Sequence, residues 1–202
     1  MAHAFTDVLS QEELNYLTSA PEVQAAKASI DTRESGQVYF SMQIPATIHQ
    51  KLQGRLGLTL PTTVPMRWVK GDTAPHVDVG PRSFETTHLM YLTDNEGELI
   101  VNGTRYPINC GSAYTFSEGL NHETVNTGSV PRLLLGPMSE RGLVVGATLP
   151  PGCCPDPVQL IGLSYSVRND ITAGSIISQT PPPRFSSYSA YYQMIMAKST
   201  RK

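Results

Sequence analysis

The middle of the chain is built from short apolar runs separated by turn residues. Between about Val64 and Met138 these runs are VPMRWVK, THLMYLT, GELIVNG, TRYPIN, SAYTFS, HETVN and RLLLGPM. Their β-branched and aromatic content is typical of strands, and their spacing predicts antiparallel strands arranged as a sandwich or barrel. Asn102-Gly103, between ELIV and TRYPI, predicts a two-residue hairpin because both positions of such a turn require positive φ.

The first 60 residues have a different, mostly helical pattern. Ser10 followed by Glu13 is a capping box that predicts a helix over about 10–19, and Pro21 can open a second helix. Further along, QVYFSMQI has the pattern of a strand and PATIHQKLQGRLG that of a helix. We therefore expect residues 1–60 to form a helical support with one strand.

Regular signals weaken beyond Gly142. The segments LPPGCCPDP and TPPPRFSS are rich in proline and must be irregular, whereas VQLIGLSYSV predicts a strand and SSYSAYYQMIMAKS a final helix. We expect one domain over residues 1–202. Its core would span 64–138, and residues 143–202 would form a proline-rich extension that packs on this core.

Composition and charge narrow the classes of function. Among 202 residues, 15 Lys and Arg face 17 Asp and Glu, a formal net charge of -2. This balance argues against nonspecific binding to nucleic acid or to a membrane surface, since both depend on clustered positive charge. The N-terminal sequence lacks the pattern of a secretory signal, so a cytoplasmic location is expected. The three cysteines lack a Cys-x-x-Cys spacing, which argues against structural zinc.

Two of the five histidines lie in informative surroundings. In APHVDVG, His76 and Asp78 are two residues apart, so an extended segment would place both side chains on one face of a strand. A single cation could then bind both. His122, in NHETVN, begins another predicted strand and is the candidate third ligand.

Two imidazoles and one carboxylate suit more than one metal. On one face of an octahedron they leave three positions open, as iron(II) requires when it binds a chelating cosubstrate and dioxygen. Zinc is also compatible with two histidines and a carboxylate. The triad alone therefore leaves the metal open.

Arg132 favours iron(II). The segment HETVNTGSVPR would form a hairpin if it turned near Thr127 and Gly128, which would set Arg132 across from His122 on the next strand of the same sheet. The guanidinium would then lie close to the metal, and arginine is suited to a bidentate contact with a carboxylate. This arrangement predicts an anchor for a dicarboxylic acid beside the metal.

Three segments together resemble the 2-oxoglutarate and iron(II)-dependent oxygenase superfamily, and within it the prolyl-hydroxylase-like branch. They are RWVKGDTAPHVDVG, TTHLMYL and NCGSAYTFSEGLNHETVNTGSVPRLLL. The resemblance covers roughly residues 64–138 and depends on the His-x-Asp pair, the distal His, the later Arg and a Gly-x-x-x-x-F strand. It implies a mainly β fold with flanking helices (α+β), whose core is a double-stranded β-helix, or jelly roll.

By position, the resemblance implies that His76, Asp78 and His122 bind iron(II) and that Arg132 binds the distal carboxylate of 2-oxoglutarate. Tyr91 matches a tyrosine that often hydrogen-bonds the same cosubstrate. The implied activity is that of a dioxygenase that hydroxylates a C–H bond of a peptidyl or small-molecule substrate, with a proline-like substrate as one expectation. Ascorbate is a candidate reductant.

Two residues near these motifs have other expected roles. Trp68 stands near a position where related enzymes often have tyrosine, so it departs from the family pattern. His88 and Tyr91 are three residues apart on one predicted strand and should point to opposite faces. We expect His88 to be a structural residue.

The sequence bears differently on three alternatives to a hydroxylase. Repair of alkylated nucleic acid is disfavoured because RLLLGPMSERG lacks the second arginine of those enzymes and the chain is not basic. A cupin-like module that binds a metal or small molecule would use the same jelly roll without oxygen chemistry. A degenerate oxygenase that acts through its proline-rich tail is disfavoured by the intact triad.

Overall fold

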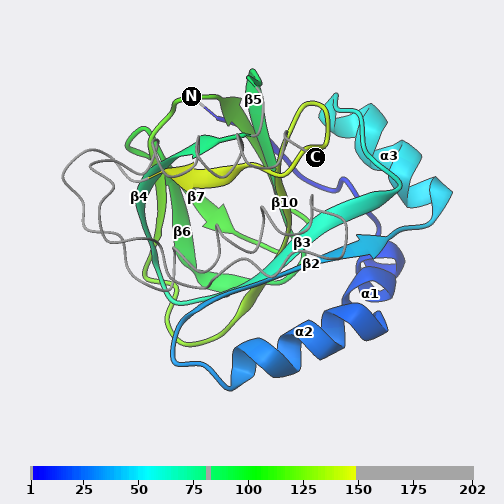
Figure 1. Ribbon diagram of the computed structural model, residues 1–202, viewed down its shortest axis with the longest axis horizontal. Coiled ribbons are helices and arrows are strands. Elements are labelled where there is room, and N and C mark those ends of the chain that lie inside the picture. Colours follow the sequence, from blue (N-terminus) through cyan, green and yellow to red (C-terminus); the bar gives the residue numbers. More distant parts are fainter. Residues whose placement is uncertain (1, 81–82, 149–202) are drawn as a thin grey trace, which may run out of the picture.

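The strands of the protein form two antiparallel sheets that face each other. The computed structural model describes residues 2–80 and 83–148. One sheet has six strands, in the spatial order β1 (His3–Phe5), β8 (Ala113–Ser117), β5 (Thr86–Tyr91), β10 (Arg132–Ser139), β3 (Thr63–Lys70) and β2 (Gly36–Gln43). The other has five, in the order β11 (Gly146–Thr148), β4 (Thr73–Val79), β9 (His122–Val125), β6 (Asn95–Val101) and β7 (Thr104–Ile108). Figure 1 shows the two sheets closing around a common interior.

The order of the eight strands from β3 to β10 identifies the fold. In the larger sheet the order β8-β5-β10-β3 places the first and last of these strands side by side, and in the smaller sheet the order is β4-β9-β6-β7. Every pairing among them is antiparallel. This arrangement is the jelly roll, or double-stranded β-helix, so the predicted fold class is confirmed.

Three helices cover the outer face of the larger sheet (Figure 1). They are α1 (Gln11–Ser19), α2 (Pro21–Asp31) and α3 (Ala46–Leu56), close to the predicted segments. Ser10 and Glu13 form the expected reciprocal capping box at α1, and Pro21 is the first residue of α2. Gly57 ends α3 at φ 66°, a left-handed conformation that glycine adopts without steric cost.

Apolar side chains are divided between two layers. One layer lies between the helices and the outer face of the larger sheet, and includes Leu17, Leu52 and Trp68. The other lies between the two sheets and includes Leu99 and Leu134. The larger sheet is therefore covered on both faces, which explains why all eight residues of β10 are buried.

The alternation of side chains along β3 separates Trp68 from the interior. The Trp68 indole points to the helical layer, where Nε1 donates to the Val23 carbonyl oxygen at 3.0 Å. The neighbouring Arg67 pairs across the sheet with Leu134, a residue of the layer between the sheets. Trp68 therefore does not replace an inward-facing tyrosine, and Arg67 is the side chain of β3 that faces inward near that position.

Two parts of the sequence-based architecture need correction or lie outside the described residues. Residues 1–60 contain two strands rather than one, because His3–Phe5 forms the edge strand β1 beside β8. Three residues are too few to give an alternating pattern. Of the predicted extension 143–202, the structure describes only the part up to Thr148, where β11 pairs with β4. The predicted strand and helix farther along lie outside the described residues.

Local turn chemistry agrees with the sequence at the tip of the β6–β7 hairpin. Asn102 and Gly103 both have positive φ, at 48° and 81°, as the hairpin turn requires. The register on either side pairs Val101 with Thr104.

Among the described helices, none combines the length and the apolar character needed to cross a bilayer.

His88 lies on β5 with its side chain away from the space between the sheets. It pairs with Met138 of β10, is 3% exposed, and both of its ring nitrogens are buried without a hydrogen-bond partner. Burial lowers the pKa of His88 to about 4, against a weaker opposing effect of the Glu140 charge. The imidazole is therefore neutral in the folded protein at neutral pH, in agreement with a structural role.

Acidification should destabilise the fold through His88. The unfolded chain takes up a proton near pH 6.5 and the folded chain only near pH 4, so the free energy of unfolding falls as pH falls through this window. The expected loss is about 3 kcal/mol. A His88→Leu variant should be at least as stable at pH 7 and should show a flatter decline between pH 6.5 and 4 in urea titrations. Parallel declines in the two proteins would contradict this assignment.

Candidate metal centre

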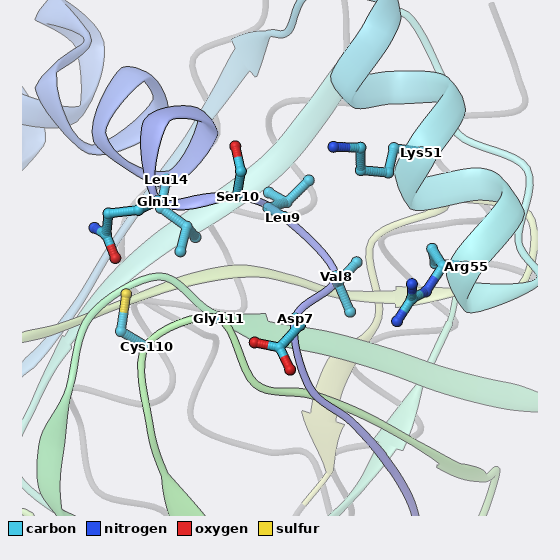
Figure 2. Close-up of a pocket in the computed structure, with 10 residues that line it drawn as sticks. All are labelled: Asp7, Val8, Leu9, Ser10, Gln11, Leu14, Lys51, Arg55, Cys110 and Gly111. Carbon is cyan, nitrogen blue, oxygen red and sulfur yellow. The ribbon is translucent and has the colours of Figure 1, made fainter.

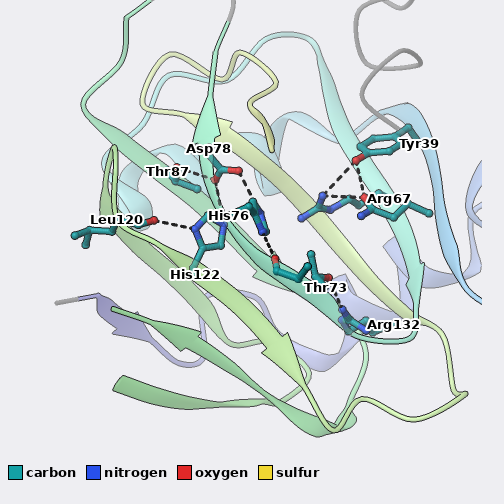
Figure 3. Close-up of polar contacts among 11 residues, drawn as sticks. Tyr39, Arg67, Thr73, His76, Asp78, Thr87, Leu120, His122 and Arg132 are labelled. Atoms are coloured by element: carbon teal, nitrogen blue, oxygen red, sulfur yellow. Dashed lines mark hydrogen bonds and ion pairs between the residues drawn. The ribbon is translucent and has the colours of Figure 1, made fainter. Parts of the chain in front are cut away.

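The structure brings His76, Asp78 and His122 together between the two sheets. One ligand atom from each residue lies within 4.8 Å of the other two, and all three side chains are buried. Asp78 Oδ1 is 3.8 Å from His76 Nε2, and Asp78 Oδ2 is 3.5 Å from His122 Nε2. Figure 3 shows the two imidazoles converging on the carboxylate.

Strand pairing accounts for this geometry. His76 and Asp78 are two residues apart on β4 and share a face, as expected from the sequence. His76 pairs directly with His122 of β9, and the two rings lie 4.1 Å apart between centroids. The third ligand, 44 positions after Asp78 in the numbering, is therefore brought in by the neighbouring strand of the same sheet.

Each histidine is oriented for metal binding by a local hydrogen bond. His76 Nδ1 lies 2.7 Å from the Ala74 carbonyl oxygen, and His122 Nδ1 lies 3.1 Å from that of Leu120. A carbonyl oxygen can only accept, so the Nδ1 atoms carry the protons and both Nε2 atoms face Asp78 with a free lone pair.

The donor set fits a divalent cation. Ligand atoms bound at ~2.0–2.2 Å to one ion lie roughly 3 to 3.5 Å apart, so the observed separations need only a small contraction. Burial, with a further effect of His122, lowers the pKa of His76, while Asp78 opposes this shift. His76 is therefore neutral at pH 7, the form that binds metal.

Arg132 lies beside the triad in a fully buried position. It is 1% exposed, and its guanidinium donates to the Gly71 carbonyl oxygen at 2.8 Å and to the Thr124 hydroxyl at 2.7 Å. A longer contact of 3.2 Å joins it to the Thr73 hydroxyl, and its Nε has no partner. Burial lowers the pKa of Arg132 to about 10, so the side chain stays charged at neutral pH.

The predicted route by which Arg132 approaches the metal is wrong. Strand β9 belongs to the five-stranded sheet and β10 to the six-stranded sheet, so His122 and Arg132 do not face each other in a hairpin. Arg132 instead reaches across the interior to Thr124, which shares a strand and a face with His122. The short linker between β9 and β10 is a crossover between the sheets and not a hairpin turn.

An irregularity in β4 aims both Thr73 and His76 inward. The two residues are three apart and would point to opposite faces of a regular strand. The pairing with β9 shifts between them, with Thr73 opposite Thr124 and His76 opposite His122. A bulge of this kind changes which face a side chain occupies. It lets one strand contribute both to the metal site and to the surroundings of Arg132.

Tyr91 also faces the interior, and His88 faces away from it, as their spacing predicts. Tyr91 is 1% exposed and packs with the residues between the sheets. Burial raises the pKa of Tyr91 to about 12, and the charge of Arg132 opposes this effect. The phenol is therefore a neutral hydrogen-bond donor beside Arg132.

Comparisons with known proteins show similarity in structure only. No protein-family model and no curated protein matches the chain. Several solved oxygenases are similar in fold. A prolyl-4-hydroxylase from Pseudomonas putida is 16% identical with a TM-score of 0.46, over 66% of this chain and 89% of its own. A 2OG-Fe(II) oxygenase family oxidoreductase from Burkholderia pseudomallei is 12% identical with a TM-score of 0.45, over 71% and 86%.

A third similar structure is a non-haem α-ketoglutarate-dependent epimerase of nogalamycin biosynthesis. It is 17% identical with a TM-score of 0.44, over 66% of this chain and 74% of its own. At such low identities the function of these proteins does not transfer to this chain. The jelly roll itself follows from the strand order described above.

Thr87 is a further site residue that the sequence did not reveal. Its hydroxyl donates to Asp78 Oδ2 at 3.0 Å, and the residue is fully buried on β5, in the opposite sheet. This hydrogen bond fixes the carboxylate that faces both histidines. Because the contact crosses the sandwich, no local motif could have pointed to it.

Removing the Thr87 hydroxyl should weaken the metal site without dismantling it. Loss of such a supporting hydrogen bond lowers metal affinity about 10- to 100-fold, and we expect this for iron(II) binding by Thr87→Val. Anaerobic titration calorimetry measures the change. Thr86→Val is a matched control, since its side chain lies on the other face of β5. Equal affinities in the two variants would remove Thr87 from the site.

One surface hollow lies away from the triad, between the N-terminal segment and α3 (Figure 2). Its volume is about 540 Å³, and none of the three candidate ligands lines it. Two of its lining residues are cations with partners of their own. Lys51 pairs with Glu13 at 2.6 Å, and Arg55 donates to the Thr6 carbonyl oxygen. These contacts join α3 to α1 and to the N-terminal segment, so we assign the hollow no binding or catalytic role.

Proposed function

We propose that the protein is an iron(II) and 2-oxoglutarate-dependent dioxygenase that hydroxylates a C–H bond of a peptidyl or small-molecule substrate. The observation that carries the proposal is the juxtaposition of a buried two-histidine, one-carboxylate triad with a buried, charged arginine. Arg132 contacts Thr124, on the strand that also bears His122. A metal ligand set and an anchor for a carboxylate thus face the same interior.

The arginine favours iron(II) over zinc. A hydrolytic zinc site needs its three ligands and a water, whereas a buried guanidinium beside them has no part in that scheme. The oxygens that accept hydrogen bonds from Arg132 are neutral: those of Gly71, Thr73 and Thr124, and the phenol oxygen of Tyr91. A buried cation of this kind is suited to a bidentate contact with a carboxylate such as the distal group of 2-oxoglutarate.

The roles of the residues follow from their positions. His76, His122 and Asp78 would bind the iron, and Thr87 would orient Asp78. Bound there, iron(II) supplies the oxygen chemistry in which 2-oxoglutarate becomes succinate and carbon dioxide while a substrate C–H bond is hydroxylated. Ascorbate would serve as the reductant that keeps iron in the iron(II) state.

Residues of the six-stranded sheet would bind the distal end of the cosubstrate. Arg132 would contact its distal carboxylate, with the hydroxyl of Thr124 as a neighbouring donor. Tyr91, a neutral phenol beside Arg132, would donate a further hydrogen bond to the same group. A proline-like substrate is our first candidate, from the likeness of the sequence motifs to those of prolyl hydroxylases.

The test is formation of succinate by the full chain with iron(II), oxygen and 2-oxoglutarate, with and without candidate substrates. We expect slow succinate formation without substrate, faster formation with a substrate, and none in His122→Ala. A protein that binds iron but neither binds nor consumes 2-oxoglutarate would refute the proposal. That result would favour a cupin-like binding module of the same fold.

A further inference from the structure

Arg67 is a second inward-facing arginine that the proposed chemistry does not use. On β3 it pairs with Leu134, which in turn pairs with Tyr91 of β5, so the three residues lie in one row across the larger sheet. Arg132 is two residues from Leu134 on β10 and shares its face. Arg67 therefore faces the same interior as Arg132 and the metal ligands, and Figure 3 shows it on the side of the site where His76 lies.

The hydrogen-bond partners of Arg67 are neutral. Its Nη1 donates to Gln37 Oε1 at 3.0 Å and contacts the Tyr39 hydroxyl at 3.4 Å, and the guanidinium carbon lies 5.9 Å from the centre of the Tyr39 ring. The Tyr39 hydroxyl itself donates to Gln37 at 2.5 Å. Arg67 Nε is buried with no partner. Within residues 2–80 and 83–148, no carboxylate forms an ion pair with Arg67.

In the part of the chain that the structure describes, the positive charge of Arg67 is not offset by an anion that pairs with it. Its positive charge disfavours protonation of His76 and lowers the pKa of Arg132, so it acts on both halves of the site. The negative charge of Asp72 opposes this effect on Arg132, and the Asp72 carboxylate accepts hydrogen bonds from Thr127. Arg67 is left without a compensating charge of its own.

Bound metal and cosubstrate would not give Arg67 an anion of its own. The Asp78 carboxylate and the two carboxylates of 2-oxoglutarate would be engaged by the metal and by Arg132, and Asp72 accepts hydrogen bonds from Thr127. A half-buried cation attracts an anion more strongly than an exposed one because solvent screens it less. Both printed hydrogen bonds of Arg67 use Nη1, and Nε, a buried donor without a partner, belongs to the fork of N–H groups that binds a carboxylate bidentately.

We propose that Arg67, held in place by Gln37 and Tyr39, is a binding site for a carboxylate of the primary substrate. The proposal rests on the proposed function, since it assumes that the cosubstrate occupies Arg132. It predicts that the enzyme acts on a free acid, such as an amino acid, an organic acid or a chain with an exposed carboxylate. A neutral analogue of the same shape would be a poor substrate.

The two arginines can be followed separately by nitrogen NMR. Both Nε atoms are buried and unpartnered, so their N–H protons should exchange slowly enough to give resolved signals. Arg67→Lys and Arg132→Lys assign the two signals by their loss. The full chain loaded with zinc, which binds the same ligands without redox chemistry, is titrated first with 2-oxoglutarate and then with acetate, propionate and their amides.

We expect 2-oxoglutarate to shift the Arg132 signal, and acetate or propionate then to shift the Arg67 signal in a saturable way. The acids should bind about 10- to 100-fold more tightly than the amides, the usual difference for a hydrogen bond to a charged group. In Arg67→Gln, ligand-detected NMR should show that this preference is lost while 2-oxoglutarate affinity is unchanged. Arg55→Gln, an exposed arginine, is the matched control.

Three outcomes would overturn the proposal. Acids and amides could act alike on the Arg67 signal, or neither could shift it, and then Arg67 is no carboxylate site. Alternatively, 2-oxoglutarate could shift the Arg67 signal and block the response to acetate, which would assign Arg67 to the cosubstrate. A failure of the proposed function looks different: 2-oxoglutarate would leave the Arg132 signal unchanged, while the response of Arg67 to acetate could still be read.

Discussion

His76→Ala and Asp78→Ala are each expected to lose more than about 100-fold in iron(II) affinity, because removal of a direct ligand exceeds the loss from removing a supporting group. Both side chains are buried and face each other with His122. The contacts between the carboxylate and the two imidazoles are long, at 3.5 Å and 3.8 Å, so these contacts should contribute little to the stability of the fold. The affinity is measured by anaerobic titration calorimetry and the fold by circular dichroism.

The matched control for this experiment is His3→Ala. His3 is an exposed histidine on the edge strand β1, so its loss removes an imidazole without touching the site. We expect the control to bind iron(II) as the unchanged protein does. Iron(II) affinity that survives in both His76→Ala and Asp78→Ala, in folded protein, would show that the metal binds elsewhere.

Arg132→Leu is expected to weaken 2-oxoglutarate binding at least about 100-fold. Truncating one partner of a buried, hydrogen-bonded charge pair costs about 2–5 kcal/mol, much of it from the charge left unpaired. Iron(II) affinity should change little, since Arg132 is not a candidate ligand. Calorimetry with zinc-loaded protein measures the binding of 2-oxoglutarate apart from any turnover.

Two further variants separate the charge of Arg132 from its geometry. Arg132→Lys keeps the positive charge but loses the fork of donors, so part of the affinity should return. Thr124→Val removes one neighbouring hydroxyl and should cost only about tenfold. Arg55→Leu removes an exposed arginine as a control. Unchanged 2-oxoglutarate affinity in Arg132→Leu would place the cosubstrate anchor at another residue.

Much of the fold was predictable because its signals are local. The capping box at Ser10, the proline that opens α2 and the Asn102-Gly103 turn each act within a few residues, and each agrees with the structure. The alternation of His76 and Asp78 on one strand is local as well. Features of this kind need only the chain's own geometry, so a single sequence is enough to find them.

The features of the site that the sequence did not predict depend on contacts between the two sheets. Arg132 reaches Thr124 across the interior, whereas the sequence suggested a hairpin, because a short linker can connect strands of one sheet or of two. Thr87 meets Asp78 from the opposite sheet, and nothing near it in the sequence points to this contact. Bulges add a further difficulty, since the one in β4 reverses the face that counting assigns to Thr73.

Adjacent residues of strand β3 face two different layers, so the register in which β3 pairs with its neighbours is critical. Trp68 anchors the helices through the Val23 carbonyl oxygen, and Arg67 presents its charge to the metal side. A slip of one residue would exchange them, burying a guanidinium among aliphatic side chains and turning an indole toward the metal. The packing of the helical support and the orientation of Arg67 toward the interior thus depend on one alignment, so a change in either would disturb the other.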